Sequence, residues 1–493
     1  MLKLSDYRKE LNPREVRHWH DLEIAGVSNN SREIGKGFIF CAIRGAKNDG
    51  RRYIANALEN GAAAIVSDDP LLSIPDTIPH LITDNAYHAW GMLCQTYAGF
   101  PGNTMHLHAV TGTNGKTTTA FLLRNLIQRT LHAKCGLIST VEYDCGAGSP
   151  AVESARTTPD AMAFQKIMKT MAENGCTHVV LEASSHGLHQ KRMGSAKFDT
   201  AVFTNLTGDH LDYHHTMEAY YQAKKTLFSD QLSEKGHAIV NIDDPWGARL
   251  AEELRREGKN TVTLSARSAA DCRITSLSIA DSGSVFQLEW MGKTFKLRTN
   301  LIGLHNLYNL GSAAAAALAM GIPAEELVEH LSEEVSVPGR LEMIALPNGA
   351  SAFVDYAHTD DALERVLSAL RPLCRGRLIC VFGCGGDRDR TKRPRMAEVC
   401  GRLSDLPIIT SDNPRTEKPE DIIEEAASGM PAGKEFLKIT DRKSAIEKAV
   451  ALSRPGDLIL IAGKGHENYQ EINGVRHHFD DREILKNLSR TAG

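Results

Sequence analysis

Apolar runs alternate with amphipathic stretches along most of the chain. In the first hundred residues, GFIFCAIRG at 37–45 reads as a strand, and ANALENGAAAIVSDD at 55–69 predicts a helix, a glycine stop and a second strand. Farther on, apolar strands expected at 107–110, 177–185 and 199–206 are separated by helical segments. This alternation predicts a doubly wound parallel sheet of the α/β class.

Two turn-rich segments divide the pattern. AGFPGNT at 98–104 and SVPGRLE at 336–342 are rich in Gly and Pro and interrupt the alternation of strands and helices. At 271–298 apolar and polar residues alternate, which favours antiparallel strands. We therefore expect three domains: a small N-terminal α/β domain at 1–103, a central phosphate-loop ATPase-like parallel sheet at 104–336, and a C-terminal Rossmann-like domain at 337–493.

The last third holds three similar units, each an apolar strand followed by a polar loop. Because ligands bind at the carboxyl ends of parallel strands, these loops should converge on one site. They carry Arg390 in the first loop, Asp412, Asn413 and Arg415 in the second, and Gly463, His466 and Glu467 in the third. Guanidinium groups beside carboxylates suit a zwitterionic ligand. The alternative, solvated loop charges without a ligand, stays open.

Composition narrows the function classes. The 57 basic and 61 acidic residues nearly balance, so we expect neither a nucleic-acid nor a membrane partner. The N-terminus lacks an export pattern, and the most apolar segment, at 311–322, is too short to span a bilayer, so a cytoplasmic location is expected. Ten cysteines without a Cys-x-x-Cys pair read as reduced, buried thiols.

TGTNGKTTT at 111–119 is the most informative segment. It follows an expected strand with two interleaved histidines and leads into an amphipathic helix, so backbone N–H groups and the helix dipole favour a phosphate at this turn. The glycines allow close approach, Lys116 would reach the terminal phosphates, and Thr117 would bind a phosphate-bound Mg²⁺. The alternative is an accidental Gly-Lys-Thr surface turn. The expected nucleotide-binding residues are Gly112, Thr113, Asn114, Gly115, Lys116, Thr117 and Thr118.

Carboxylates and histidines follow the next two strands. Glu182 ends an apolar strand, where its carboxylate can face a metal at the phosphate loop. Asp209, His210, Asp212, His214 and His215 lie within seven residues after the following strand. The spacing of His210 and His214 is compatible with zinc, but a third ligand is unspecified. Loop histidines without a ligand role are the other interpretation.

Two downstream segments are candidates for completing a nucleotide pocket. In GLHNLYN, Asn306 and Asn309 share one face of a helix start, where their amides would meet a base or ribose or simply cap the helix. In VDYAHTDD, Asp355 and His358 end a strand of the third domain, where they would touch nucleotide across a cleft or only cap the next helix.

Taken in order, these segments resemble the Mur ligases, the ATP-dependent amide ligases of peptidoglycan assembly. The likeness runs through TGTNGKTTT, LEASSHGL, TNLTGDHLDYH, YYQAKKTLF, GLHNLYN, PGRLE, VDYAH, GGDRDRTKRP, SDNPR and AGKGHE. SNNSR and DGRRYI resemble the branch that adds the third amino acid to UDP-N-acetylmuramoyl-L-alanyl-D-glutamate. Within it, SDNPR resembles enzymes that take meso-diaminopimelate rather than lysine, since Arg415 would bind a distal carboxylate that lysine lacks.

The resemblance implies roles for individual positions. For the UDP-sugar end it implies Asn29, Ser31, Ala46, Lys47 and Asn48, and for the peptidyl part Thr157, Thr158, Ser184, Gln190 and Arg192. Magnesium ligands are implied at Glu182 and His210, and nucleotide contacts at Asn306, Arg340 and Asp355. The amino-acid site is implied at Arg390, Asp412, Asn413, Pro414, Arg415, Gly463 and Glu467.

Lys224 resembles a lysine that the family carbamylates, which would turn a cation into an anionic metal ligand; Lys225 beside it leaves the register open. On sequence alone Lys224 reads as a solvated helix lysine. Two features depart from the family: Asp360 stands where proline is common, and Lys47 and Asn48 differ from the usual sugar contacts.

The implied reaction is transfer of the γ-phosphoryl of ATP to the D-glutamyl γ-carboxylate, with Lys116, Lys224 and His210 at the reacting centre, followed by attack of the diaminopimelate amine. We expect ATP and Mg²⁺ as cofactors and a monomer. The rivals are a lysine-adding relative, folylpolyglutamate synthase and, from another class, a phosphate-loop switch; the switch lacks a guanine-reading Asn-Lys-x-Asp segment.

Overall fold

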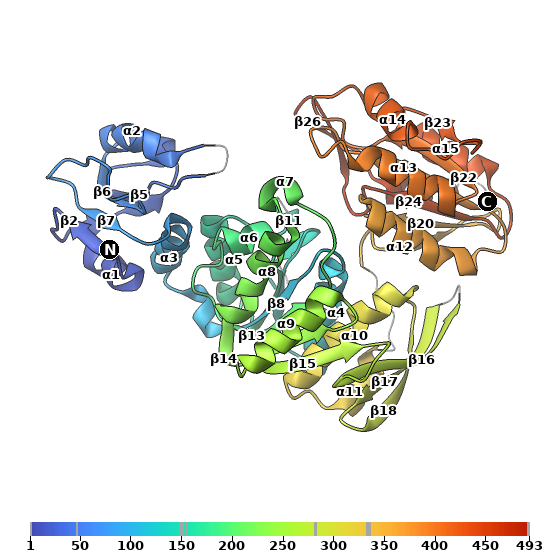
Figure 1. The fold of residues 1–493 in the computed structure, drawn as a ribbon, viewed down its shortest axis with the longest axis horizontal. Helices are drawn as coiled ribbons and strands as arrows, with labels where there is room; N and C mark the ends of the chain where they lie inside the picture. Colours follow the sequence, from blue (N-terminus) through green and yellow to red (C-terminus); the bar gives the residue numbers. More distant parts are fainter. Residues whose placement is uncertain are drawn as a thin grey trace.

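The computed structural model describes residues 2–45, 48–146, 152–153, 156–280, 283–331 and 337–490. Within these ranges, three sheets with helices on both faces follow one another along the chain and lie in a row (Figure 1). Two small antiparallel ribbons add to them: β1 (Leu2–Lys3) pairs with β3 (Glu23–Ile24), and β25 (Tyr469–Ile472) pairs with β26 (Val475–His478).

The N-terminal sheet has the order β2-β7-β6-β5-β4. All neighbours are parallel except β2 and β7. Its strands are β2 (Glu15–Arg17), β4 (Gly26–Ser28), β5 (Phe38–Cys41), β6 (Ala62–Ser67) and β7 (His80–Ile82). One face packs on α1 (Leu4–Leu11) and α3 (Ala86–Ala98), and the other on α2 (Ile54–Glu59). The short turns η1 (Ser31–Glu33) and η2 (Gly50–Tyr53) follow β4 and β5.

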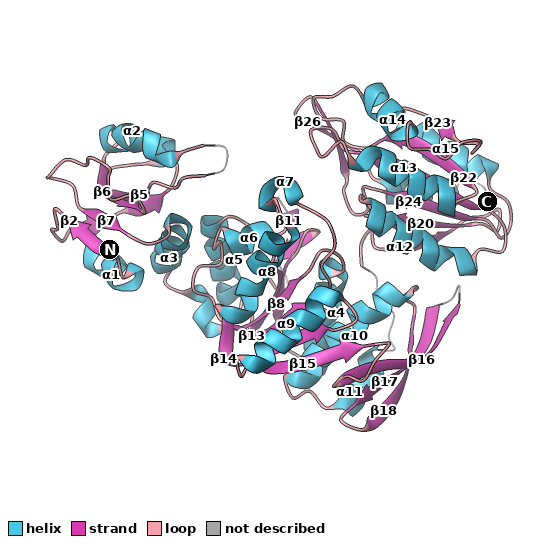
Figure 2. Ribbon diagram, viewed as in Figure 1, coloured by secondary structure: helices cyan, strands magenta, loops and turns pink. Residues whose placement is uncertain are grey.

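Within the described residues, the central sheet has eleven strands in the order β11-β10-β9-β12-β8-β13-β14-β15-β16-β17-β18. Its strands are the magenta arrows in the middle of Figure 2, with β16, β17 and β18 at one end. The run β9-β12-β8-β13-β14-β15-β16 within this order is parallel throughout, as the alternating pattern predicts. The remaining pairs at its two ends are antiparallel. The strands are β8 (His106–Thr111), β9 (Cys135–Ile138), β10 (Glu142–Asp144), β11 (Val152–Glu153), β12 (His178–Glu182), β13 (Phe198–Phe203), β14 (Leu232–Asn241), β15 (Asn260–Ser265), β16 (Cys272–Ala280), β17 (Gly283–Trp290) and β18 (Lys293–Thr299).

Helices cover both faces of the central sheet. On one face lie α4 (Lys116–Thr130), α10 (Leu304–Ala319) and α11 (Ala324–Leu331). On the other lie α5 (Ala161–Glu173), α8 (Met217–Ser229) and α9 (Pro245–Arg256). Strands β8 and β12 are buried from both sides, and their inner positions are mostly apolar, apart from the buried His108, Thr111 and Glu182. The turn η3 (Pro101–Thr104) leads into β8, and the short helices α6 (Ser185–His189) and α7 (Leu211–His214) follow β12 and β13.

The expected antiparallel strands at 271–298 are β16, β17 and β18. They extend the parallel sheet rather than form a separate one, because β16 pairs in parallel with β15 through Leu264–Cys272 and Ser265–Arg273.

The C-terminal sheet has the order β19-β20-β24-β21-β22-β23. Its strands are β19 (Glu342–Ala345), β20 (Ser351–Asp355), β21 (Leu378–Cys384), β22 (Leu406–Ser411), β23 (Leu437–Lys438) and β24 (Leu458–Ala462). Helices α12 (Asp360–Leu370), α13 (Lys392–Leu403) and α14 (Pro419–Ala427) cover one face, and α15 (Arg442–Leu452) and α16 (Asp481–Arg490) the other. The turn η4 (Arg371–Leu373) follows α12. Strands β24, β21 and β22 are parallel neighbours, so the three polar loops open at one edge, as predicted.

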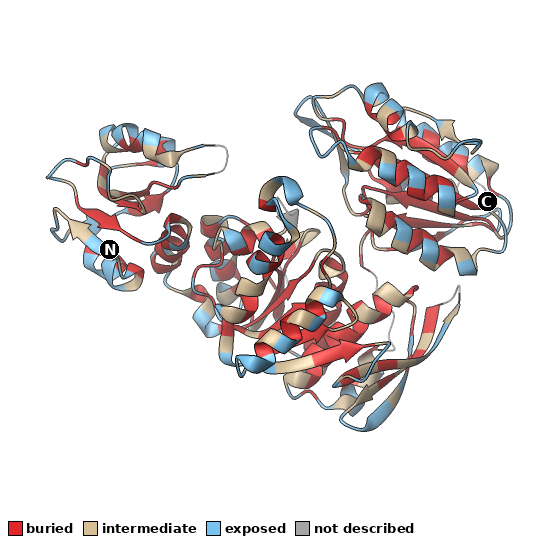
Figure 3. Cartoon of the chain, in the orientation of Figure 1, coloured by how far each residue is buried: buried red, intermediate tan, exposed pale blue. Residues whose placement is uncertain are grey.

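Burial follows the sheets. Red, buried positions fill the strands and the helix faces turned toward them, while the outer helix faces are exposed (Figure 3). In the part of the chain that the structure describes, no helix has both the length and the apolar character needed to cross a bilayer.

Candidate active site

The expected phosphate loop joins β8 to α4. Gly112 and Gly115 have φ values of 146° and 86°, a region that side chains strain to adopt. A Cβ at Gly112 would lie 1.9 Å from Thr204 Oγ1, so the neighbouring strand end also requires glycine there. Thr204 Oγ1 donates to Asn114 O at 2.6 Å, and Asn114 N donates to Asn205 Oδ1 at 3.0 Å. The loop is therefore held open by the segment after β13, rather than lying as a free surface turn.

Two lysines point into this loop. Lys116 Nζ donates to Gly112 O at 3.0 Å and to Thr113 O at 2.8 Å. Lys224 Nζ, on α8, donates to the same Gly112 oxygen at 2.8 Å, and its side chain is 1 % exposed. Burial and the Lys116 cation hold the pKa of Lys224 well below its usual range. Lys224 is therefore a buried part of the loop's surroundings, and the solvated-lysine interpretation is wrong.

Side chains with oxygen donors lie at the start of α4, where Thr117 stands, and at the end of β12, where Glu182 stands. The Glu182 carboxylate is fully buried and accepts from Thr140 N at 2.8 Å and from Thr140 Oγ1 at 3.0 Å. Glu182, Thr117 and His210 line the same cavity. A hydroxyl and a buried carboxylate beside a phosphate loop are the donor set that Mg²⁺ prefers, so these residues fit that ion.

The histidine-rich segment does not support zinc. His210 precedes α7 with a left-handed φ of 55°, and its ring packs edge-on against His186 at 4.9 Å. His214 is buried, and burial lowers its pKa to about 4. Among the described residues, no three His, Cys, Asp or Glu side chains are placed to hold a metal ion.

The positions implied for the peptidyl substrate come together beside Glu182. Thr157 Oγ1 accepts from Thr140 Oγ1 at 3.1 Å, and Thr158 Oγ1 accepts from Ser184 N at 2.9 Å. The guanidinium of Arg192 donates to Thr158 O at 2.7 Å and to Gln190 Oε1 at 2.8 and 3.0 Å. One connected polar group thus links these five positions to the phosphate-loop edge of the sheet.

The N-terminal positions lie at one edge of their sheet. Asn29 directly follows β4, Ser31 lies in η1 and is buried, and Asn48 lies in the loop after the parallel neighbour β5. Ala46 and Lys47 lie outside the described residues.

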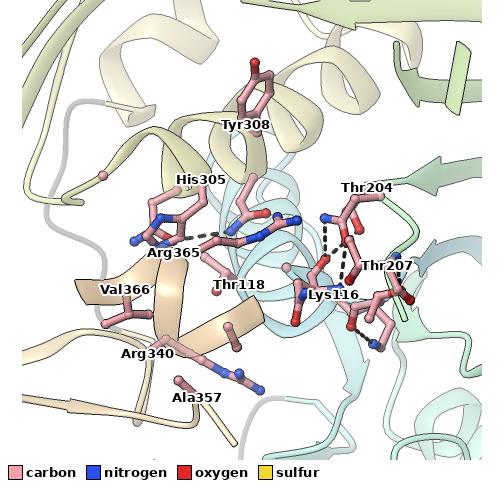
Figure 4. Close-up of a pocket in the computed structure, with 18 of the residues that line it drawn as sticks. Lys116, Thr118, Thr204, Thr207, His305, Tyr308, Arg340, Ala357, Arg365 and Val366 are labelled. Carbon is pink, nitrogen blue, oxygen red and sulfur yellow. Dashed lines mark hydrogen bonds between the residues drawn. The ribbon is translucent and has the colours of Figure 1, made fainter. Parts of the chain in front are cut away.

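A cavity of about 960 Å³ opens in front of the phosphate loop. Figure 4 shows Lys116, Thr118 and His305 of the central part opposite Arg340, Ala357 and Val366 of the C-terminal part, and all six residues line the cavity. This volume is in the range of protein sites that bind small molecules such as nucleotides. Thr113, Asn114, Gly115, Asn306, Asn309, Asp355 and His358 also line the cavity.

Several of these lining residues already form hydrogen bonds within the protein. Asn306 Nδ2 donates to Ile302 O at 2.9 Å, and Asn309 Nδ2 donates to Asn306 Oδ1 at 3.3 Å. Asp355 accepts from Leu341 N and Ala357 N, both at 2.8 Å, so it orders the chain on either side of β20. The cap of α12 is Thr359, not Asp355 or His358.

The C-terminal part contacts the phosphate loop directly. Arg340 Nη2 donates to Thr117 Oγ1 at 3.0 Å, and the guanidinium lies 4.8 Å from the ring centre of Tyr356. Asp361 Oδ2, on α12, accepts from Asn114 Nδ2 at 2.9 Å and from Thr207 Oγ1 at 3.2 Å. The two parts of the chain therefore meet at the loop expected to bind phosphate.

The loops of the C-terminal sheet form a second polar group. Asp412 is buried, and Asn413 Nδ2 donates to Glu467 Oε2 at 2.8 Å. Gly463 has a φ of 117°, and a Cβ there would lie 2.6 Å from Asp412 Oδ2. Although burial alone would raise it, the pKa of Asp412 is held below its usual range by the Lys464 and Arg442 cations.

Arg415 and Arg390 differ in their surroundings. Arg415 has a φ of 52°, donates through Nη1 to Gly386 O at 2.7 Å, and pairs with Glu471 at 3.3 Å. Gly386 N donates to Asn413 O at 2.9 Å, which brings the first loop onto the segment that holds Pro414. Arg390 is 64 % exposed and pairs with Glu425 on α14, so its role at an amino-acid site stays a prediction.

Three residues that form hydrogen bonds to the site residues were not predicted from the sequence: Thr140, Asp361 and Lys464. A threonine in a loop and an aspartate in a helix's first turn carry no local signal. The buried Lys464 lies inside AGKGHE, where a lysine in a loop normally reads as solvated.

Comparisons with known proteins agree with this architecture. Family profiles described as "Mur ligase family, catalytic domain", "Mur ligase middle domain" and "Mur ligase, glutamate ligase domain" match residues 23–95, 110–317 and 339–465. The UDP-N-acetylmuramoyl-L-alanyl-D-glutamate–2,6-diaminopimelate ligase of Gloeobacter violaceus is 42% identical over 477 residues, covering 95% of this chain and 94% of the relative.

Solved structures show the same fold. A structure of a ligase with that same name matches at 34% identity and a TM-score of 0.68, covering 95% of each chain. A folylpolyglutamate synthase of Mycobacterium tuberculosis complexed with ADP matches in fold at 19% identity and a TM-score of 0.63, covering 77% of this chain and 92% of that one. With three matching profiles and a near full-length relative, this chain belongs to the Mur ligase family.

Proposed function

We propose that this chain joins meso-diaminopimelate to the D-glutamyl γ-carboxylate of UDP-N-acetylmuramoyl-L-alanyl-D-glutamate, with ATP as the source of activation. The observation that carries the proposal is the cavity at the phosphate loop, which the C-terminal part borders through Arg340 and Asp361. A nucleotide there lies between two substrate-binding regions. The name of the 42% identical relative supports the choice of substrates.

The three regions divide the substrates among them in this proposal. Residues 1–103 hold the UDP-sugar end through Asn29, Ser31 and Asn48, and 104–336 hold ATP and the peptidyl part. Residues 337–493 hold the amino acid. Asp412 supports this last assignment: among the described residues its buried carboxylate accepts a hydrogen bond from the backbone N–H of Asn413 and from no side chain, so a substrate ammonium group could bind it.

The reaction proceeds in two balanced steps. A γ-carboxylate oxygen attacks the γ-phosphorus of ATP, and the bond from that phosphorus to the β-phosphate oxygen breaks. ADP departs, and the γ-carboxylate has become an acyl phosphate. The neutral amine of diaminopimelate then attacks the acyl carbon, the bond to the phosphate oxygen breaks, and phosphate and a proton depart. Activation is needed because a carboxylate has no adequate leaving group.

Side chains of this chain supply position and charge. Lys116, which donates to two loop carbonyls, would turn its ammonium toward the phosphates. Mg²⁺, held by Thr117, Glu182 and His210, would neutralise phosphate charge. Lys224 stays a candidate for carbamylation, and its buried amine beside Gly112 O supports that role. Arg340 and Asp361 would hold the C-terminal part against the loop and exclude water.

Arg415 is the basis for choosing diaminopimelate over lysine. Its guanidinium is oriented by Gly386 O and Glu471, with side-chain exposure of 19%, so it is fixed but reachable. A fixed fork of this kind binds a carboxylate, and only diaminopimelate has one at its distal end.

Phosphate release tests the proposal. With the UDP-dipeptide and ATP, meso-diaminopimelate should support turnover and a UDP-tripeptide product, whereas L-lysine should support little. A preference for lysine would favour the lysine-adding relative. Phosphate release that needs neither amino acid would favour a phosphate-loop switch, and glutamate addition to a folate would favour the folylpolyglutamate synthase relative.

A further inference from the structure

Lys464 is a fully buried lysine in the loop after β24. Its side chain is 0 % exposed, a rare state for an ammonium group unless partners compensate the lost hydration. None of the steps above uses it. Its neighbours in the loop are Gly463 and Gly465, both with left-handed φ values, so the backbone turns tightly around it.

The Lys464 ammonium contacts two residues expected to bind the amino acid. Nζ donates to Asn413 Oδ1 at 3.1 Å and to Glu467 Oε2 at 3.0 Å, while Asn413 Nδ2 donates to the same Glu467 oxygen at 2.8 Å. The three side chains close a triangle of hydrogen bonds. Above it, Tyr469 on β25 places its ring 5.3 Å from the ammonium.

The β25–β26 ribbon extends this arrangement toward Arg415. Glu471 N donates to Asn413 Oδ1 at 3.0 Å. That oxygen therefore accepts hydrogen bonds from both Lys464 Nζ and the backbone of β25. Arg415 N donates to Glu471 O at 3.0 Å, and the Glu471 carboxylate pairs with the Arg415 guanidinium. A displaced Asn413 would therefore disturb Arg415 as well.

The charged groups around Lys464 come from several elements. Glu467 shares its loop, Asp412 follows β22, and Arg442 on α15 faces both carboxylates while pairing with Asp481 on α16. Burial raises the pKa of Glu467, and Lys464 opposes that rise. The other titratable groups in range are His358 near Asp412, His466 near Lys464, and Tyr356 near Glu467.

We infer that Lys464 is a positioning residue for the amino-acid substrate: its ammonium holds the side chains of Glu467 and Asn413 in the orientation in which they face that substrate. The inference rests on the proposed function for the identity of that substrate. Lys464 itself is too buried to contact the amino acid.

The test compares four variants by steady-state phosphate release. Lys464→Met replaces the aliphatic stem with one of similar length and removes the ammonium, and Lys443→Met makes the same change at an exposed lysine of α15. Glu467→Gln removes the partner's charge, and the double variant Lys464→Met/Glu467→Gln removes both. We expect Lys464→Met to raise KM for diaminopimelate about 30-fold, because one member of a buried charge pair is lost, while KM for ATP and for the UDP-dipeptide stays within about twofold.

The pH profile separates an electrostatic role from a structural one. Removing the ammonium should raise the pKa values of Glu467 and Asp412, so the acid limb of kcat/KM for diaminopimelate should move to higher pH in Lys464→Met. The Lys443→Met profile should match wild type. An unchanged KM and acid limb, with only a lower Tm, would overturn the inference.

The double variant decides the matter if Lys464→Met does not fold. If Lys464 acts through Glu467, KM in the double variant should lie within about fivefold of that in Glu467→Gln. A further increase beyond about tenfold would contradict the inference. The amino-acid preference of the wild-type enzyme tests the proposed function separately. If the wild type prefers another amino acid, the proposed function is wrong. The effect of Lys464→Met is then measured as the change in KM for the amino acid that the enzyme uses.

Discussion

Individual side chains in this chain act through contacts that join distant segments. Lys116 and Lys224 lie 108 positions apart in the sequence, yet both donate to Gly112 O. Lys116 thus adds an ammonium group at a turn that already presents helix N–H groups, and Lys224 holds the carbonyl of that turn from a second helix. A site of this kind favours an anion with several charges, such as the end of a nucleoside triphosphate.

The variant Lys116→Ala tests the role of this single side chain in phosphoryl transfer. Because the ammonium would stabilise charge that develops during phosphoryl transfer, the variant should lose about 1000-fold or more in kcat. Binding of the UDP-dipeptide, measured by calorimetry, should stay detectable. Lys166→Ala, at an exposed position of α5, provides the control. If Lys116→Ala ligated at the wild-type rate, this lysine would have no role in phosphoryl transfer.

At the scale of elements, the phosphate loop depends on how closely α4 and α10 approach. A Cβ at Gly115 would lie 2.2 Å from Asn309 Oδ1, and Gly115 itself has a φ of 86°. The start of α10 therefore fixes the shape of the turn that begins α4.

Gly115→Ala should lower ATP affinity about tenfold or more, because both the strained backbone and the clash with Asn309 distort the loop. Gly175→Ala shares the strain, with a φ of 77°, but a Cβ there has no neighbour within 4 Å. It should cost about 1 kcal/mol of stability and leave ATP affinity unchanged. Equal effects of the two variants in calorimetry would rule out the role of Asn309.

Strand β8 carries a titratable group in its buried face. His108 is 1 % exposed, bonds Thr200 Oγ1 through Nδ1 at 2.9 Å, and has its pKa lowered from 6.5 to about 3 by burial and by His178 and His106. The unfolded chain takes up this proton near pH 6.5 and the folded chain does not, so stability falls as pH drops below that value.

Between about pH 7.5 and pH 5, His108 should account for about 2 kcal/mol of lost stability. His108→Gln should reduce the pH dependence of the free energy of unfolding by that amount, whatever its effect at pH 7.5. His477→Gln, at an exposed position, should leave the slope as it is. Urea titrations at several pH values measure both, and parallel slopes for wild type and His108→Gln would contradict the prediction.

Local patterns were sufficient for the elements and insufficient for the contacts between them. The start of α4 at Lys116 and the strands β21, β22 and β24 follow from apolar runs and turn residues that lie within each segment. Strand β16 follows β15 directly along the chain, yet the two pair in parallel through only Leu264–Cys272 and Ser265–Arg273, so the place of β16 in the central sheet could not be predicted from its own alternating pattern. The burial of Lys224 and Lys464 depends on packing from other segments and was equally hidden.

The whole molecule brings two of its three α/β units, the central and the C-terminal one, together around one cavity. The contact of Asp361 with Asn114 spans 247 positions, and that of Arg340 with Thr117 spans 223. Contacts so distant leave no periodic trace in the sequence. They let the C-terminal part respond to whatever occupies the phosphate loop.

Asp361→Ala should weaken this contact. Losing hydrogen bonds from Asn114 and Thr207 should raise KM for ATP about fivefold, and solution scattering with a non-hydrolysable ATP analogue should show a larger radius of gyration than wild type. Asp360→Ala changes the adjacent carboxylate, which faces Arg395 instead, and should match wild type. Identical behaviour of the two variants would show that the contact is dispensable.

Oxygen tracing tests the central claim most directly, namely that a phosphoryl group passes from ATP at this loop to the bound carboxylate. The UDP-dipeptide is labelled with ¹⁸O in the D-glutamyl γ-carboxylate, and the released phosphate is examined by ³¹P NMR. An acyl phosphate requires one ¹⁸O to appear in each phosphate released, and this is the result we predict. Phosphate without label, formed at the rate of ligation, would contradict the account.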